Sequence, residues 1–105
     1  MKVVFHPAAE ADFEDLIDFI VGRAGARIAQ GQADKALASL STIGDYPRTS
    51  KYDADLDVFE AWLPGTRYIA FYRIRQDLDS VIVLAIIDHA RNTAGTKRRL
   101  ITVRG

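Results

Sequence analysis

The chain has 105 residues, 49% of them hydrophobic and 27% charged, which is the composition of one soluble globular domain over residues 1–105. It contains no cysteine, which excludes disulfides, thiolate metal sites and cysteine nucleophiles and agrees with a cytoplasmic location. No apolar run approaches the roughly 20 residues of a membrane span, and the N-terminus lacks the pattern of a signal peptide.

The net charge of zero conceals two halves of opposite sign. Residues 1–60 hold 6 Lys and Arg against 11 Asp and Glu, whereas residues 61–105 hold 8 against 3. This division indicates either separate partners for the two ends of the molecule or acids that lie on solvated helix faces.

A short strand and two helices are predicted in the first half of the chain. The strand over residues 2–5 ends at His6-Pro7, because proline is well placed in the first turn of a helix. From residue 8 to about 24, apolar positions recur at the spacing of one helix face, with acids in the first turns. A second helix over 26–43 is expected to bury a stripe of mostly small residues, to which the larger Leu37 also belongs. The two helices are expected to pack as an antiparallel hairpin.

Three strands are predicted in the second half. After a polar loop over 48–55, residues 56–63 form the first of them, and Pro64-Gly65 leads into a β-hairpin. The runs RYIAFYRI and SVIVLAII form this hairpin, because each is rich in β-branched and aromatic residues. A loop of residues 77–79 sets Arg67 opposite His89, whereas a loop one residue shorter sets Arg67 opposite Ala90.

The two faces of this hairpin differ in chemistry, because successive strand residues point to opposite sides. The odd-numbered face carries Arg67, Arg73, Arg75 and His89 among exposed apolar residues, and any chemistry is expected there. The even-numbered face is nearly free of charge and is expected to be the core; it carries Tyr68, Ala70, Tyr72, Ile74, Ile82, Leu84 and Ile86.

Residues 92–105 form a basic C-terminal tail without a clear period, in which residues 100–103 could form a short strand. The order of elements is therefore β-α-α-β-β-β. It predicts an α+β fold in which a short N-terminal strand and an antiparallel three-stranded meander complete one sheet, with the two-helix hairpin packed on it.

The chain resembles the ParE/RelE superfamily of bacterial type II toxins over about residues 3–92. The resemblance is carried by HPAAEADFEDLIDFI, YPRTSK, TRYIAFYRI and IIDHARN, which occur in the order typical of that superfamily. The first matches the family's S-P-x-A-x-x-D-L-x-x-I opening, with His6 in place of Ser and Phe13 in place of Leu. The full first motif and the His-Ala-Arg that ends the last strand resemble the ParE-like branch more than the RelE-like branch.

The resemblance implies the toxin component of a type II toxin–antitoxin module, of the kind that serves plasmid stabilisation or addiction. Its implied partner is a cognate ParD-like antitoxin, and no membrane, metal or small-molecule cofactor is implied. The ParE-like branch is known for poisoning DNA gyrase, which implies a DNA gyrase inhibitor that acts by binding. The alternative is a RelE-like ribosome-dependent mRNA endoribonuclease.

In the endoribonuclease alternative, Arg67 would hold the scissile phosphate and His89 would act as general acid or base. The sequence lacks the loop Glu that serves as base in one nuclease variant, and Ala90-Arg91 replace the aromatic pair of such enzymes. The structural alternatives remain open: Arg67 paired with Asp57 or Glu60, and His89 hydrogen-bonded at a strand end. Trp62 is expected in the core.

Two binding surfaces follow from the resemblance and the hairpin faces. The target is expected to contact Arg67, Arg73, His89, Arg91, Lys97, Arg98 and Arg99. The antitoxin, laid in a groove as a helix or added as a strand at a sheet edge, is expected to contact Phe13, Leu16, Ile20, Leu37, Phe71, Val81, Val83 and Ile87.

Overall fold

The computed structural model describes residues 1–90 and 93–102. Within these residues the predicted order is confirmed, with one strand, one α-helix and one short 3-10 helix in addition. The elements are β1 (Lys2–Phe5), α1 (Pro7–Ala24), α2 (Ala26–Asp45), β2 (Lys51–Asp53), β3 (Val58–Trp62), β4 (Tyr68–Arg75), the short 3-10 helix η1 (Gln76–Leu78), β5 (Ser80–Asp88) and α3 (Thr93–Thr102).

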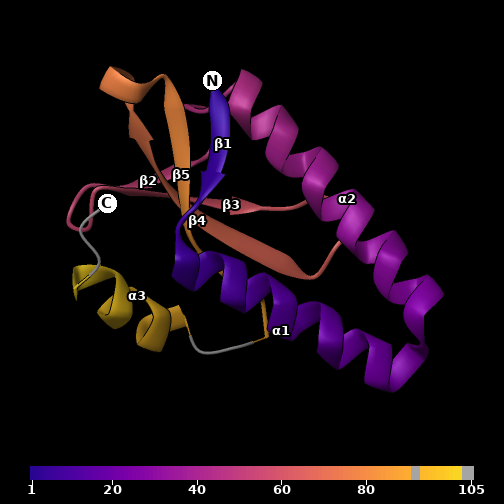
Figure 1. Ribbon diagram of the computed structural model, residues 1–105. Coiled ribbons are helices and arrows are strands. Elements are labelled where there is room, and N and C mark those ends of the chain that lie inside the picture. Colours follow the sequence, from indigo (N-terminus) through magenta and orange to yellow (C-terminus); the bar gives the residue numbers. More distant parts are fainter. Residues whose placement is uncertain (91–92, 103–105) are drawn as a thin grey trace.

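The five strands form one mixed sheet in the order β1-β5-β4-β3-β2. The pairs β2–β3, β3–β4 and β4–β5 are antiparallel, but β1 pairs in parallel with β5. The expected α+β class and the antiparallel meander of β3, β4 and β5 are confirmed, and the sheet as a whole is mixed rather than purely antiparallel. The α1–α2 hairpin carries the chain from β1 at one edge to β2 at the other, and β5 returns beside β1 (Figure 1).

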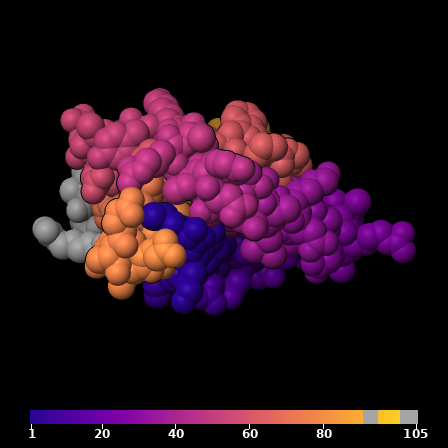
Figure 2. Space-filling view, turned by 90° about the horizontal axis from the view of Figure 1, so that it is seen from above, coloured from indigo at the N-terminus to yellow at the C-terminus, as the bar shows by residue number. Residues whose placement is uncertain are grey.

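Capping residues and a glycine mark the start of α1 and the connection between α1 and α2. The Nδ1 of His6 accepts a hydrogen bond from the backbone N–H of Ala8 at 3.1 Å, and Pro7 occupies the first turn. Gly25 alone connects the helices, at a φ of 91° that favours glycine. The connection projects beyond the rest of the molecule (Figure 2). No helix in the described part of the chain is long and apolar enough to cross a membrane.

The turn between β4 and β5 is one residue longer than expected. Arg75, rather than Gln76, pairs with Ser80, because η1 occupies the connection. Asp79 closes it in the left-handed region, with a φ of 47°.

A β-bulge later compensates for this longer turn. Tyr72 pairs with Val83 but Phe71 pairs with Ala85, so Leu84 is the extra residue on β5. Beyond the bulge the register is the expected one. The backbone N–H of His89 accordingly donates to the carbonyl oxygen of Arg67 at 2.7 Å, which confirms that these two residues lie opposite each other.

The bulge also exchanges the two faces of β5, because it interrupts the alternation of side chains. Leu84 and Ile82 belong to the cluster on the sheet face away from the two long helices, so their expected place in the helix-side core is wrong. The expected exposure of three odd-numbered residues is wrong too: each of them is 0% exposed, and they are Phe71, Val81 and Val83. The helix-side core contains Val81 and Val83 with Tyr68, Ala70, Tyr72 and Ile86.

The second sheet face is covered by α3, in the segment expected to be a basic tail. Leu100 of α3 is 0% exposed and packs with Val58, Phe71 and Leu84. Residues 100–102 are helical, so the expected strand is wrong for them, and residue 103 lies outside the described part.

Candidate functional site: a groove beside the end of the hairpin

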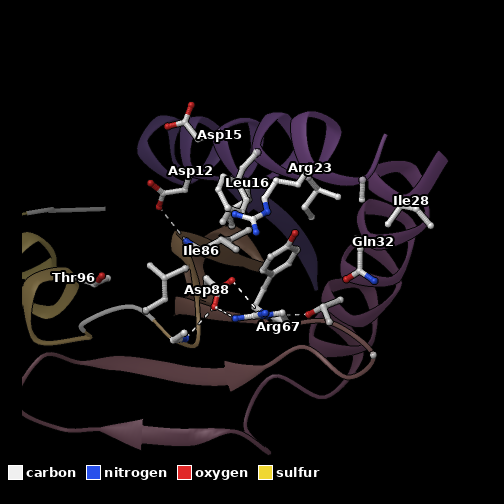
Figure 3. Close-up of a pocket in the computed structure, with 18 of the residues that line it drawn as sticks. Asp12, Asp15, Leu16, Arg23, Ile28, Gln32, Arg67, Ile86, Asp88 and Thr96 are labelled. Atoms are coloured by element: carbon white, nitrogen blue, oxygen red, sulfur yellow. Dashed lines mark hydrogen bonds and ion pairs between the residues drawn. The ribbon is translucent and has the colours of Figure 1, made fainter. Parts of the chain in front are cut away.

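A groove of about 1160 Å³ lies between the two long helices and the open end of the β4–β5 hairpin, opposite its turn, with α3 at one side (Figure 3). This open end, at residues 65–68 and 86–90, is called the hairpin end below. Its lining combines apolar side chains with charged ones. The apolar lining comes from Leu16, Phe19, Ile20, Ile28, Tyr68, Ile86 and Ile87, and the polar lining from Asp12, Asp15, Arg23, Gln32, Thr66, Arg67, Asp88, Thr96 and Arg99.

The groove exists because the helices are longer than the strands they cover. An 18-residue helix such as α1 extends about 27 Å, so the connected ends of α1 and α2 overhang the sheet. Phe19 and Ile28 near this overhang are 56% and 53% exposed. The guanidinium of Arg23 lies over the Phe19 ring, 5.3 Å from its centroid. The overhang therefore leaves apolar surface without a partner in the described chain.

Arg67 is bound to a carboxylate at the hairpin end. Its Nε lies 3.4 Å from Oδ2 of Asp88, and its Nη2 donates to Oδ1 over 3.5 Å (Figure 3). The expected pairing with Asp57 or Glu60 is wrong, because the acid partner comes from the neighbouring strand β5. The Arg67 side chain remains 67% exposed, so the pair is accessible from outside.

His89 and Trp62 form an aromatic pair next to Arg67. Their ring centroids are 4.8 Å apart, and the Nε1 of Trp62 donates to the carbonyl oxygen of Thr66 at 3.2 Å. Trp62 is 57% exposed, so its expected place in the core is wrong. The Nδ1 of His89 lies 3.3 Å from the carbonyl oxygen of Arg67 and 3.6 Å from Oδ1 of Asp88. The hydrogen-bonded strand-end role considered for His89 is confirmed.

Tyr68 is the buried polar residue of the groove. It is 3% exposed, and its hydroxyl has no hydrogen-bond partner among the described residues. Burial raises the pKa of this hydroxyl, as does the charge of Asp88, while Arg67 opposes the shift. The hydroxyl is therefore a neutral group near neutral pH.

Asp12 joins three elements, a role that the sequence did not reveal. Its two oxygens bind Nη1 and Nη2 of Arg99 on α3 at 3.1 and 2.8 Å. Its Oδ2 also accepts from the backbone N–H of Ile86 at 3.1 Å (Figure 3). That N–H lies beyond Phe5, where β1 ends, so β1 does not extend far enough to pair with it. The hydrogen bonds that Arg99 donates to Asp12 raise the pKa of Arg99, against the effect of burial.

Several residues expected to contact the target interact instead with other groups of this chain. Arg73 donates to the carbonyl oxygens of Asp57 and Leu56, each at 3.0 Å. Lys97 lies 3.5 Å from Oδ2 of Asp53 and 3.7 Å from Oε1 of Glu60. Arg67, His89 and Arg98 are exposed, and Arg91 lies outside the described residues.

The expected antitoxin contacts divide into three groups. Leu16, Ile20 and Ile87 line the groove. Phe13 packs edge-on against Phe5. Leu37 is 48% exposed on α2, so its expected place in the buried stripe of that helix is wrong. The third group, which comprises Phe71, Val81 and Val83, is buried and cannot form part of a surface in this structure. Among the described residues, no three His, Asp or Glu side chains are placed to hold a metal ion.

Comparison with known proteins gives one family and one fold. The family model of the ParE toxin of the type II toxin-antitoxin system parDE matches residues 3–93. A chain of the chromosomal ParDE system from P. aeruginosa has a TM-score of 0.71 at 16% identity, over 84% of this chain and 95% of that chain. A chain of the intact E. coli RelBE complex has a TM-score of 0.56 at 16% identity, over 86% of this chain and 98% of that one.

The isolated E. coli RelE toxin also has a TM-score of 0.56, at 15% identity, over 93% of this chain and 94% of that chain. At such identities these structures show a shared fold and nothing finer. Among curated proteins, none matches this chain.

Proposed function

Because this chain belongs to the ParE toxin family, we propose that it is the toxin of a type II toxin–antitoxin module, one that serves plasmid stabilisation. It inhibits DNA gyrase by binding, and a cognate ParD-like antitoxin neutralises it. The antitoxin is a binding partner that occupies part of the toxin surface.

The observation that carries the antitoxin proposal is the groove beside the hairpin end. Its apolar lining is open at Phe19 and Ile28, which are 56% and 53% exposed. An apolar helix face laid in a groove is one of the recurring ways in which proteins bind a peptide segment. Burying apolar surface contributes about 25 cal/mol per Å², so occupation of this groove favours a stable complex.

The ion pair of Arg67 with Asp88 supports binding rather than catalysis. Asp88 holds the guanidinium of Arg67, which a phosphate would have to displace. The contacts of His89 with the carbonyl oxygen of Arg67 and with the Trp62 ring fit either role.

A gyrase assay with the purified toxin tests the proposal. We expect stoichiometric toxin to inhibit supercoiling by DNA gyrase, and we expect prior addition of the antitoxin to restore it. Supercoiling that continues unchanged in an excess of folded toxin would contradict gyrase as the target. The antitoxin proposal is tested separately, by the binding of the protein encoded beside this chain's gene.

The endoribonuclease remains the second candidate because Arg67 and His89 lie side by side at the hairpin end, joined by the 2.7 Å backbone hydrogen bond. If it is correct, Arg67→Ala combined with His89→Ala abolishes transcript cleavage and growth arrest. Arg75→Ala is the matched control, since Arg75 lies at the far end of β4 from Arg67 and pairs with Asp77 there. Growth arrest with intact transcripts in the double variant rules this candidate out.

A further inference from the structure

We propose that the groove contains a polar subsite at Tyr68, which takes a hydrogen-bond acceptor from an acidic side chain of the antitoxin segment bound there. This inference rests on the proposed function, because the antitoxin is the occupant. It adds a chemical requirement to a groove that otherwise selects only for apolar surface.

The starting point is the contrast between two buried tyrosines of β4. Tyr72 is 0% exposed, and its hydroxyl donates to the carbonyl oxygen of Pro47 at 2.7 Å. Tyr68 is 3% exposed and lines the groove, and its hydroxyl has no partner among the described residues. A buried hydroxyl without a hydrogen bond lowers stability, and native proteins satisfy nearly all such groups.

Two neighbours of Tyr68, Asp88 across the strand pair and Thr66 two residues earlier, are bound to other groups. The Oδ1 of Asp88 accepts from the backbone N–H of Ala90 at 2.9 Å, and both oxygens of Asp88 bind Arg67. The hydroxyl of Thr66 donates to the carbonyl oxygen of Leu63 at 2.7 Å and accepts from the backbone N–H of Tyr68. The Tyr68 hydroxyl hydrogen-bonds to none of these groups, which leaves it open to an acceptor that a bound partner supplies.

The hydroxyl acts as a donor in this subsite, because a tyrosine hydroxyl is protonated near neutral pH, and burial raises its pKa further. It is also shielded from solvent in the free protein, so an acceptor reaches it only when the occupant displaces side chains of the groove wall. Two side chains of the groove wall, Phe19 and Arg23, are exposed and rest on each other.

The charge of the groove selects among the possible acceptors. Arg23 lines the groove without a carboxylate partner among the described residues, whereas Arg67 and Arg99 each have one. A carboxylate of the bound segment accepts from Tyr68 and neutralises Arg23. Charge-assisted hydrogen bonds are about twice as strong as neutral ones, so an Asp or Glu is favoured over an amide.

Tyr68→Phe in the full chain tests the subsite, with the antitoxin encoded beside this chain's gene as the binding probe. We expect the Kd to rise about 10-fold, because one hydrogen bond of the complex is lost. The stability of the free toxin is expected to stay unchanged or to rise, because a buried hydroxyl without a partner is removed. Tyr72→Phe is the matched control: it destabilises the free toxin and leaves the Kd unchanged.

A second variant does not depend on the core. Arg23→Gln changes an exposed side chain, so the fold is retained, and we expect the Kd to rise about 3- to 10-fold. Replacing the acidic antitoxin residue that contacts Tyr68 by its amide should then raise the Kd for the wild-type toxin. The same replacement should raise the Kd for Tyr68→Phe by a smaller factor, because the two residues are coupled in a double-mutant cycle.

The possible failures are distinguishable. If wild-type toxin and Tyr68→Phe bind the antitoxin equally well, the subsite is overturned and the proposed function stands. If no acidic residue of the antitoxin is coupled to Tyr68, the carboxylate assignment is overturned. If wild-type toxin does not bind the antitoxin at all, the proposed partner and the subsite fail together.

Discussion

Asp12 on α1 binds Arg99 on α3 through both carboxylate oxygens, at 3.1 and 2.8 Å, although the two residues are 87 positions apart in the chain. The same carboxylate accepts the backbone N–H of Ile86 at 3.1 Å. One side chain thus holds a helix of the hairpin, a strand of the sheet and the C-terminal helix together.

We expect Asp12→Ala to lower the free energy of unfolding by about 2–3 kcal/mol, because it removes charge-assisted hydrogen bonds and leaves a backbone N–H unpaired. The figure includes a reduction for solvent screening, since the Arg99 side chain is 39% exposed. Urea denaturation measures the loss. Asp15→Ala is the control, because Asp15 lies exposed on the same helix, and we expect a change within about 0.5 kcal/mol. Equal losses in both variants would contradict the role of Asp12.

Two glycines of α2 are expected to respond to alanine with opposite signs. A Cβ at Gly31 meets nothing within 4 Å, so Gly31→Ala should stabilise the protein by about 0.5–1 kcal/mol through helix propensity. A Cβ at Gly44 would lie 2.8 Å from the carbonyl oxygen of Met1 and 3.0 Å from Cγ2 of Val3.

Gly44→Ala is accordingly expected to destabilise the protein by about 1–3 kcal/mol, because backbone must move to relieve the overlap. The terminal amine of Met1, which donates to the carbonyl oxygen of Gly44 at 3.0 Å, holds β1 against this end of α2. Thermal denaturation compares the two variants. A rise in the melting temperature for Gly44→Ala would show that the strand and the helix are not held so closely.

The exchange of faces along β5 is tested by Val83→Thr. Val83 is 0% exposed in the helix-side core, so the new hydroxyl is buried, and we expect a loss of about 1–3 kcal/mol. Val4→Thr is the matched control on the edge strand, where Val4 is 44% exposed and the expected change is below about 0.5 kcal/mol. If Val83→Thr proves as mild as its control, strand β5 does not turn Val83 inward.

The pH dependence of stability should reveal the two buried tyrosines. Burial raises the pKa of Tyr68 and of Tyr72 above 10.0, so the unfolded chain loses these protons first as the pH rises. Their contribution to stability is therefore complete below pH 10 and is lost as the pH rises through 10 toward the folded pKa. The slope reaches about 1.4 kcal/mol per pH unit for each tyrosine.

Urea denaturation between pH 9 and pH 11 measures this slope. Tyr68→Phe removes one titrating group. Its free energy of unfolding should therefore fall less steeply with pH than that of the wild-type protein, by up to the slope of one proton, about 1.4 kcal/mol per pH unit. Parallel curves for the two proteins would mean that the Tyr68 hydroxyl titrates alike in the folded and unfolded states.

The long periodic elements were predictable from sequence because local spacing determines them. The second helix was expected over 26–43 and ends at Asp45, and both strands of the hairpin occur as expected. The pairing of Arg67 with His89 followed from counting outward from the turn, although the longer turn and the bulge had to cancel for that count to hold.

Elements that depend on distant partners were not predictable in this way. The strand β2 has three residues and forms only by pairing with β3. The helix α3 contains few apolar residues and is attached by contacts with distant parts of the chain. Leu100 packs on the sheet, Lys97 pairs with Asp53 and Glu60, and Arg99 pairs with Asp12. The groove was beyond prediction for the same reason, since it arises from the difference in length between the helices and the sheet.

The bulge at Leu84 has a consequence for the alignment of related sequences. Consider a relative with the same number of residues whose β4–β5 turn is one residue shorter and whose β5 has no bulge. In an alignment without gaps, the side chains of β5 would point to the same face in both proteins beyond Leu84, but to opposite faces between the turn and Leu84. Two compensating gaps, one in the turn and one at Leu84, restore the match, and comparisons of hydrophobic positions in β5 need both.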